Sequence, residues 1–187
     1  MVTEAKIIDS AIECIEKYGV QAATTRRIAE TAGVNSAAIN YYFRSKTALL
    51  DKVAQVTLAN AFDPTAIANA QGHDFREKCA SILDDLVAGG SRYPGLTRYH
   101  FNELTDGKTT SLAYQKFTEF MIRLAEFART NGVDKPQGEL ERALAQAVAA
   151  VLMMALVPAL FQDSLGVDLR DGQSRKAFIR GLVDKLL

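Results

Sequence analysis

The fold is decided by residues 24–50, whose sequence is TTRRIAETAGVNSAAINYYFRSKTALL. Thr24 and Asn35 are residue types that cap helix N-termini, and each precedes a short segment with apolar residues at helical spacing. Gly33 lies between the two segments, and glycine adopts the left-handed conformation of a tight turn without steric cost. The pattern predicts two short helices joined by a turn, which is a helix-turn-helix.

The second short helix, predicted over 36–43, has the surface that reading a base sequence requires. Ile39 and Phe43 lie one turn apart and are expected to face inward. The residues expected to face outward are Ser36, Ala37 and Asn40. Small side chains let a helix approach the major groove closely, and an asparagine amide can bond adenine through two hydrogen bonds. We therefore expect this to be the recognition helix.

The charge distribution fits a phosphate-binding face in the same segment. The chain has 22 basic and 22 acidic residues and hence no net charge. Between residues 24 and 46, the only acidic residue is Glu30, and the basic residues are Arg26, Arg27, Arg44 and Lys46. A local excess of positive charge in a neutral protein is a candidate DNA contact, although basic faces are often merely solvated. We expect Arg27 to be such a solvated charge.

Helices are also predicted on both sides of this segment. Residues 3–18 carry an apolar stripe behind a Thr3 cap, and Gly19 stops this first helix. The expected later helices begin at 46, behind a Ser45 cap, and then cover 75–86, 96–104, 112–130, 139–165 and the segment after a Ser174 cap. No segment shows the alternation of a strand, so the predicted fold class is all-α.

Glycine and proline set several of these expected boundaries. Gly89-Gly90 is expected to end the helix that starts at 75, and Tyr93-Pro94-Gly95 is expected to form a turn. Pro158 is expected to kink the helix predicted over 139–165.

Residues 143–162 contain no charged side chain and are long enough to cross a bilayer. The segment is rich in alanine and contains Gln146 and Pro158, so we favour a buried or interface-forming helix over a membrane span and expect no membrane partner. The first ten residues lack an apolar signal region, and Cys14 and Cys79 form no CxxC pair. We expect a cytoplasmic protein without disulfides, metal or cofactor.

Residues 24–50 resemble the DNA-binding signature of the TetR family of bacterial regulators. The matching positions are Thr25, Ile28, Ala29, Ala32-Gly33-Val34, Ile39, Tyr41-Tyr42-Phe43, Ser45-Lys46 and Leu49-Leu50. The resemblance covers the first fifty-odd residues strongly and extends over the rest only in size and helical pattern. It implies a tri-helical DNA-binding domain over residues 1–46 and a helical ligand-sensing and dimerisation domain over residues 47–187.

The resemblance also implies roles for individual residues. The implied DNA-binding residues are Thr25, Arg26, Ser36, Ala37, Ala38, Asn40, Tyr41, Tyr42 and Lys46. Thr25 and Lys46 correspond to phosphate contacts, Arg26 to a contact with a base or a phosphate, and a tyrosine hydroxyl to a contact with the backbone. The commonest family residue at position 40 is tyrosine, so the base preference cannot be transferred to Asn40. Of Tyr41 and Tyr42 we expect one to be buried, and we favour Tyr42 as the outward one.

The second half of the chain offers candidate ligand contacts but no compelling spacing. The candidates are Tyr99, Phe101, Phe117, Phe120, Met121 and Met154. At helical spacing such a stripe is more often ordinary core than a cavity lining. The resemblance implies a homodimer through the last two helices, a palindromic DNA operator and an unidentified small-molecule effector that relieves repression.

Two other classes of function remain open at this point. A helix-turn-helix protein without a small-molecule ligand, such as an architectural DNA binder, would share the same N-terminal residues. An all-helical enzyme or ligand carrier would make the N-terminal motif coincidental, but the sequence has no nucleophile elbow, phosphate loop or triad spacing, so we expect no enzyme. Some relatives activate transcription, and the sequence does not distinguish activation from repression.

Overall fold

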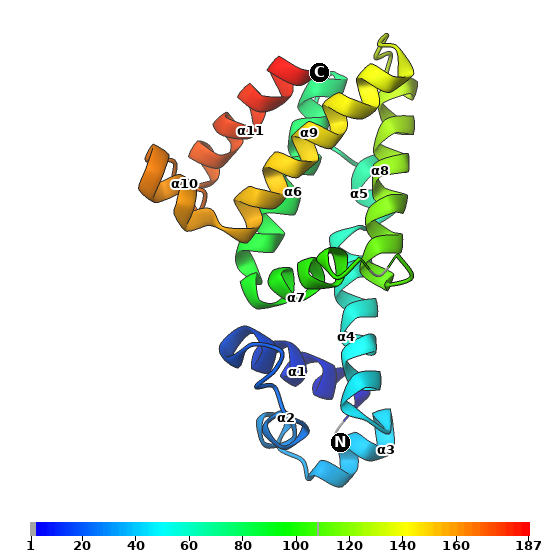
Figure 1. The fold of residues 1–187 in the computed structure, drawn as a ribbon, viewed down its shortest axis with the longest axis vertical. Helices are drawn as coiled ribbons and strands as arrows, with labels where there is room; N and C mark the ends of the chain where they lie inside the picture. The colour runs from blue at the N-terminus through cyan, green and yellow to red at the C-terminus, as the bar shows by residue number, and fades with distance from the viewer. Residues whose placement is uncertain (1–2, 108) are drawn as a thin grey trace. The chain divides into compact units, whose positions relative to one another are not determined.

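A computed structural model describes residues 3–107 and 109–187, and all regular structure within them is α-helical (Figure 1). The helices are α1 (Glu4–Tyr18), α2 (Thr25–Ala32), α3 (Ser36–Phe43), α4 (Lys46–Ala61), α5 (Pro64–Ala68), α6 (Phe75–Arg92), α7 (Pro94–Thr105), α8 (Leu112–Thr130), α9 (Gln137–Leu156), α10 (Pro158–Leu165) and α11 (Gly172–Leu186). The predicted all-α class is confirmed.

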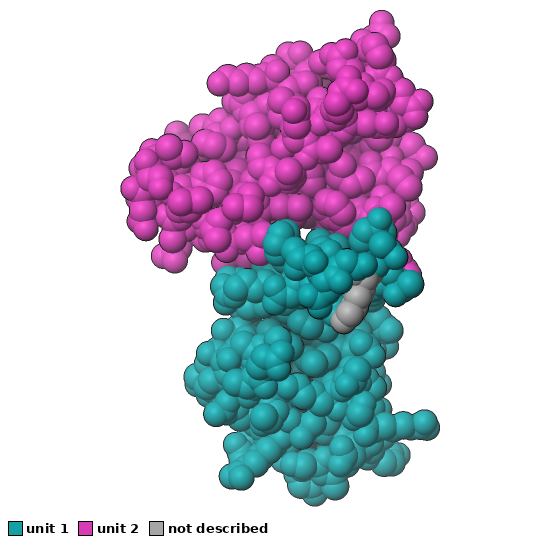
Figure 2. Space-filling view, in the orientation of Figure 1, with its two compact units in different colours: residues 1–60, 93–114 teal, residues 61–92, 115–187 magenta. Residues whose placement is uncertain are grey.

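The chain packs as two compact units (Figure 2). The first unit contains residues 1–60 and 93–114, and the second contains residues 61–92 and 115–187. The first unit therefore includes α7 as well as the four N-terminal helices. The functional division after residue 46 stays a prediction.

The core of the first unit is a small cluster of branched aliphatic side chains. Ile7 and Ile15 of α1 pack with Ile28 of α2, Ile39 of α3 and Leu49 of α4, and each is fully buried. Burial of one such side chain stabilises the fold by roughly 1.5–3 kcal/mol. Because every one of these four helices contributes to the cluster, the cluster fixes the position of α3 relative to the helices around it.

Helix α7 is attached to α1 by a carboxylate and by close backbone packing. The Glu16 carboxylate accepts hydrogen bonds from the backbone N–H groups of Gly95 (2.9 Å) and Leu96 (2.7 Å). These N–H groups belong to the first turn of α7, where the helix dipole also favours a negative charge. The Leu96 side chain is buried in the core of the first unit. Glu16, which lies 79 positions before Gly95 in the sequence, therefore caps α7.

The second unit is built around the packing of α6, α9 and α11. Fully buried side chains include Leu83 of α6, Leu144 and Met154 of α9 and Ile179 of α11. A buried ion pair joins two of these helices, because the Arg175 guanidinium donates to Asp84 at 2.6 Å. Helix α10, in contrast, has no buried residue.

Most helix caps and bounds agree with the sequence predictions, and four predicted features were wrong. Helix α6 continues through Gly89-Gly90 to Arg92, and Pro94 begins α7 instead of lying in a turn. The helix expected over 139–165 is two helices, which meet at an angle of 91° at Val157. The cap of α11 is Asp171 instead of Ser174, whose N–H donates to the Asp171 carboxylate.

Within the described residues, no single helix has the length and apolar character needed to span a membrane. Helices α9 and α10 meet those criteria only when taken together, across their bend.

Gly95 and Gly89 provide a matched test of the α1–α7 packing. A β-carbon at Gly95 would lie 2.8 Å from the Ile15 carbonyl oxygen, whereas one at Gly89 would meet nothing within 4 Å. We expect Gly95→Ala to lower the free energy of unfolding by about 1–3 kcal/mol. Gly89→Ala should raise it by about 0.5 kcal/mol, because alanine favours the helix. Urea unfolding measures both, and effects of the same sign would contradict the packing described.

Candidate DNA-binding site

The turn between α2 and α3 is built by local hydrogen bonds that the sequence predicted. The Thr24 hydroxyl accepts from the Arg27 N–H (3.3 Å), and the Asn35 side chain accepts from the Ala38 N–H (3.0 Å). Gly33 adopts φ 69° between the two helices. These bonds satisfy backbone donors at the start of each helix and fix the angle at which α3 leaves the turn.

Helix α3 has one buried and one exposed face. Ile39 and Phe43 are buried, whereas Ser36, Ala37 and Asn40 are exposed, as predicted. Ala38 is half-buried. Ser36, Ala37 and Asn40 have short side chains, which suits insertion of this part of the helix into a major groove.

The tyrosine pair differs from expectation. Both side chains are exposed, Tyr41 at 82% and Tyr42 at 40%, so neither is a core residue and Tyr41 is the more outward of the two. Their rings make an edge-to-face contact with centroids 5.3 Å apart. Ile39 and Phe43 fill the inner face, which leaves both tyrosines outside the core, and Tyr42 is the less exposed because its ring also lies against that of Phe43, with centroids 6.3 Å apart.

Two of the basic side chains near α2 have intramolecular partners. The Arg26 guanidinium donates to Glu30 at 2.9 Å on the exposed surface. Arg27 donates to the Ala22 carbonyl (2.9 Å) and lies over the Tyr18 ring, 4.6 Å from its centroid. The Arg27 guanidinium therefore stabilises the turn before α2 through contacts within the chain. The Thr25 side chain is half-buried at the first position of α2.

Lys46 at the start of α4 holds the turn between α1 and α2. Its ammonium donates to the backbone carbonyls of Val20 (3.0 Å) and Gln21 (3.3 Å). An ammonium has three N–H donors, so one remains for a phosphate. Sequence reasoning missed this bond because its partners lie 25 and 26 positions away and are backbone atoms.

The candidate ligand contacts fall into two groups. Tyr99 and Phe101 lie on α7 in the first unit, where burial raises the pKa of Tyr99 to about 12 and so keeps its hydroxyl neutral. The other four candidates lie in the second unit. Phe120 and Met154 are buried in its core, with Phe117 and Met121 packed against them. Phe62, which the sequence did not suggest, contacts the rings of Phe117 and Phe120.

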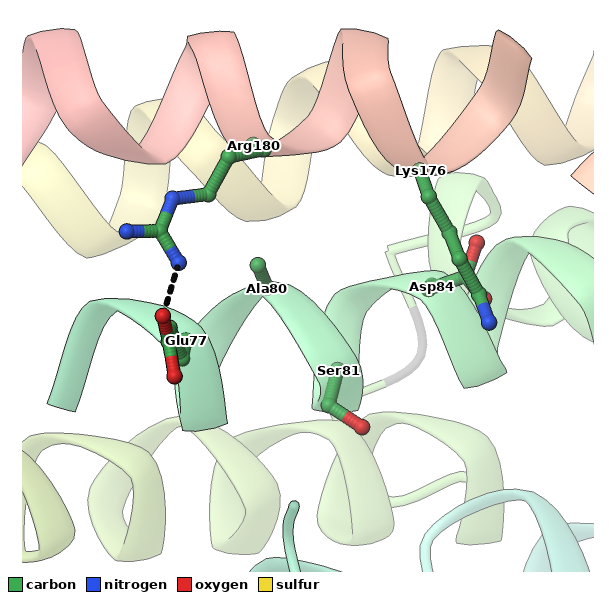
Figure 3. Close-up of a pocket in the computed structure, with 6 residues that line it drawn as sticks. All are labelled: Glu77, Ala80, Ser81, Asp84, Lys176 and Arg180. Atoms are coloured by element: carbon green, nitrogen blue, oxygen red, sulfur yellow. Dashed lines mark ion pairs between the residues drawn. The ribbon is translucent and has the colours of Figure 1, made fainter. Parts of the chain in front are cut away.

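A charged pocket lies between α6 and α11 of the second unit and contains none of the candidate ligand residues (Figure 3). Its volume is about 240 Å³, and its lining residues are Glu77, Ala80, Ser81, Asp84, Lys176 and Arg180. Arg180 pairs with Glu77 (3.5 Å) and Asp184 (3.0 Å), and Asp84 pairs with Arg175. Most of the charges here therefore neutralise one another across the α6–α11 packing.

His100 of α7 is a buried titratable group in the first unit. Its Nε2 atom lies 2.8 Å from the Thr57 hydroxyl of α4, which itself donates to the Val53 carbonyl at 2.8 Å. Nε2 therefore carries the proton and donates, and Nδ1 is an acceptor that is buried without a partner among the described residues. Burial lowers the pKa of His100 to about 4, because the charged form would lose its hydration.

These helices define a helix-turn-helix DNA-binding protein, because α3 exposes Ser36, Ala37 and Asn40 from a buried core, and α2 begins beside a turn whose carbonyls bind Arg27 and Lys46. A family model described as "Bacterial regulatory proteins, tetR family" matches residues 7–53, which span α1 to the middle of α4. Residues 7–53 therefore carry the DNA-binding signature of the TetR family, and the curated relatives and solved structures support a TetR-type transcriptional regulator, as the sequence resemblance predicted.

Curated relatives are regulators and not enzymes. The probable HTH-type transcriptional regulator YttP of Bacillus subtilis (strain 168) is 28% identical over 109 residues, which are 57% of this chain and 53% of that protein. The chain thus matches about half the length of this relative. The class D tetracycline repressor protein of Escherichia coli is 27% identical over 190 residues, covering 94% of this chain and 84% of that protein.

Solved structures of transcriptional regulators share the fold over almost the whole chain. FadR of Bacillus subtilis in complex with stearoyl-CoA matches with a TM-score of 0.69 and 18% identity, covering 98% of this chain and 97% of that one. A TetR variant from Acinetobacter baumannii AYE in complex with minocycline matches with a TM-score of 0.64 and 20% identity, covering 99% and 96%. At these identities the likeness shows the fold.

Two substitutions distinguish base reading from backbone anchoring. Asn40→Ala removes an exposed amide, and we expect it to change the ranking of duplexes that differ at single base pairs without changing stability. Lys46→Ala removes two charge-assisted hydrogen bonds, and we expect it to lower the free energy of unfolding by about 1 kcal/mol.

Lys46→Ala should also weaken binding to all duplexes about equally and make the salt dependence shallower by about 0.9 in log–log slope, as expected for one lost phosphate contact. Urea unfolding and salt titrations of binding measure these effects. An unchanged duplex ranking in Asn40→Ala, or unchanged affinity in Lys46→Ala, would contradict the assigned docking.

His100 predicts a loss of stability in acid. Its pKa falls from 6.5 in the unfolded chain to about 4 in the fold, so the unfolded state binds the proton first as the pH decreases. The contribution of neutral His100 to the free energy of unfolding is complete above pH 6.5. It is lost as the pH falls toward 4, and the total loss is about 3 kcal/mol. His100→Gln, which keeps an N–H donor for Thr57, should flatten this part of the stability–pH curve. Parallel curves for the two proteins would exclude the buried neutral state.

Proposed function

We propose that the protein is a ligand-responsive transcriptional repressor that binds a palindromic operator as a homodimer and acts in the cytoplasm. The observation that supports this most directly is the exposed face of α3, where Ser36, Ala37 and Asn40 face outward from a fully buried core. A single helix of this length contacts only a few base pairs. Two copies related by a two-fold axis read a longer inverted repeat, which is how dimeric helix-turn-helix proteins gain specificity.

The second unit supports a dimer through its last helices. Large apolar side chains are exposed at the end of α9 and along α10, including Met153, Val157, Leu160 (53% exposed) and Leu165 (64% exposed). Helix α10 buries none of its residues within the described chain. A second copy that covers these side chains would remove them from water, at about 25 cal/mol per Å² of apolar surface. The proposed interface is α9 and α10 together with α11.

The effector we propose is a small, largely apolar molecule bound in the second unit. Two solved structures that share the fold hold minocycline and stearoyl-CoA, and the acyl chain of stearoyl-CoA is apolar. In this chain the residues best suited to such a ligand are Phe62, Phe117, Phe120 and Met121, because rings and a thioether can repack around an apolar guest. An effector shifts the protein between conformers only by its difference in affinity for them.

Helix α7 offers a route from the second unit to the DNA-binding helices. The chain passes between the units at residues 60–61, 92–93 and 114–115, so both ends of the α7 segment continue directly into helices of the second unit. The Glu16 bonds attach the start of α7 to α1. A ligand that displaces α6 or α8 would therefore act on the DNA-binding helices through α7.

Selection from a pool of random duplexes tests the proposal. We expect the wild type to enrich one inverted repeat, because two copies of α3 read two half-sites. Leu160→Glu should place a charge in the proposed interface, yield monomers in sedimentation and enrich only a half-site with lower affinity. Ile122→Glu is the matched control, since Ile122 is equally exposed (55%) on α8 and should leave the dimer intact.

Enrichment of an inverted repeat by Leu160→Glu at wild-type affinity would contradict the interface. No enrichment by a folded, dimeric wild type at low salt would contradict sequence-specific DNA binding.

A further inference from the structure

The residue that ends the recognition helix has an unfavourable backbone conformation. Arg44 has φ 63° and ψ −31°, and it is the one residue other than glycine with positive φ in the described chain. L-residues avoid this region, and the ψ angle lies outside even the left-handed helical well. The conformation is held in place because the Arg44 N–H donates to the Asn40 carbonyl (3.0 Å) and the next N–H, of Ser45, donates to Phe43 (2.7 Å). Glycine would adopt it with less strain.

The Arg44 side chain differs from the other basic side chains of the segment. Arg26, Arg27 and Lys46 each donate to a carboxylate or a backbone carbonyl. The Arg44 guanidinium is exposed and makes no hydrogen bond or ion pair within residues 3–107 and 109–187. It is therefore the one cation of the segment whose full donor set is available for a ligand.

The position of Arg44 suits a phosphate contact at the edge of the groove. Helix α3 has 8 residues and is about 12 Å long at 1.5 Å per residue, a length close to the width of the major groove, roughly 12 Å. When the face carrying Asn40 lies in the groove, the residue just after the helix lies near one sugar–phosphate strand. A guanidinium presents several N–H donors to phosphate oxygens and is the preferred side chain for this contact.

We propose that Arg44 is a further DNA-binding residue, whose guanidinium contacts a backbone phosphate at the end of α3, and that an arginine is kept in a strained conformation for this contact. The inference rests on the DNA-binding role of the helix-turn-helix. The competing explanation is that the positive charge only complements the C-terminal end of the α3 dipole. In that case the charge would affect stability and not binding.

Three variants at one position separate charge from strain. Arg44→Gly removes both, Arg44→Gln removes the charge and keeps the strain, and Arg44→Lys keeps both. The matched control is Arg170→Gln, which removes another exposed arginine of the loop before α11. Binding of each full-length protein to a random-sequence duplex of about 30 base pairs is titrated between about 50 and 200 mM salt, and thermal unfolding is followed in parallel.

We expect Arg44→Gln and Arg44→Gly to bind more weakly at low salt. The slope of log affinity against log salt concentration should be shallower by about 0.9 in both variants. The increase in salt should therefore weaken their binding by a factor about threefold smaller than for the wild type. Arg44→Lys and Arg170→Gln should keep the wild-type slope. Arg44→Gly should raise the midpoint of thermal unfolding by a few degrees because it relieves the strain, whereas Arg44→Gln should not.

Wild-type affinity and slope in both Arg44→Gln and Arg44→Gly would overturn the inference and leave Arg44 as a helix cap. A wild type that fails to bind any duplex, in contrast, would contradict the DNA-binding role itself.

Discussion

The hydrogen bonds from the Glu16 carboxylate to the first turn of α7 are the constraint on which this account of the molecule depends. They bring together segments 79 and 80 residues apart, and Gly95 allows the backbones of α1 and α7 to approach within contact distance. Together with the buried Leu96 side chain and the contact between His100 and Thr57, they attach α7 to the four N-terminal helices. With them, α7 belongs to the DNA-binding unit, although both of its chain ends lead into the second unit. In the ligand-responsive repressor that we propose, α7 would connect the ligand-binding helices with the DNA-binding helices.

A few buried side chains and local hydrogen bonds hold the helix-turn-helix together. One buried aliphatic side chain from each of α2, α3 and α4 meets two from α1, and the caps fix the turns between them. Cationic side chains close the turn before α2, where Lys46 and Arg27 bind three successive carbonyls, those of Val20, Gln21 and Ala22. A phosphate that draws the Lys46 ammonium toward DNA would thus act on the turn that positions α2. If Lys46 contacts DNA as proposed, affinity and local stability are coupled at this residue.

Sequence reasoning succeeded where the physical cause was local. The Thr24 and Asn35 caps, the Gly33 turn and the inward pair Ile39 and Phe43 follow from rules that span at most four residues. It failed where distant contacts decide the outcome. Helix α6 continues through two glycines to Arg92, and the Lys46 and Glu16 bonds connect residues that no spacing rule relates. The break at Val157 is sharper than a proline kink, because this residue leaves the helical region altogether, with φ −133°.

Amide hydrogen exchange in the first turn of α7 tests the central claim, that α7 and α1 form one cooperative unit. We predict that the Gly95 and Leu96 amides of the wild type exchange as slowly as the buried amides of α1, because both open in the same unfolding event. Glu16→Gln should speed exchange at these two amides while leaving the amides around Leu144 in the second unit unchanged. Fast exchange of Gly95 and Leu96 in the wild type, or rates that Glu16→Gln does not alter, would contradict the coupling of α7 to the DNA-binding helices.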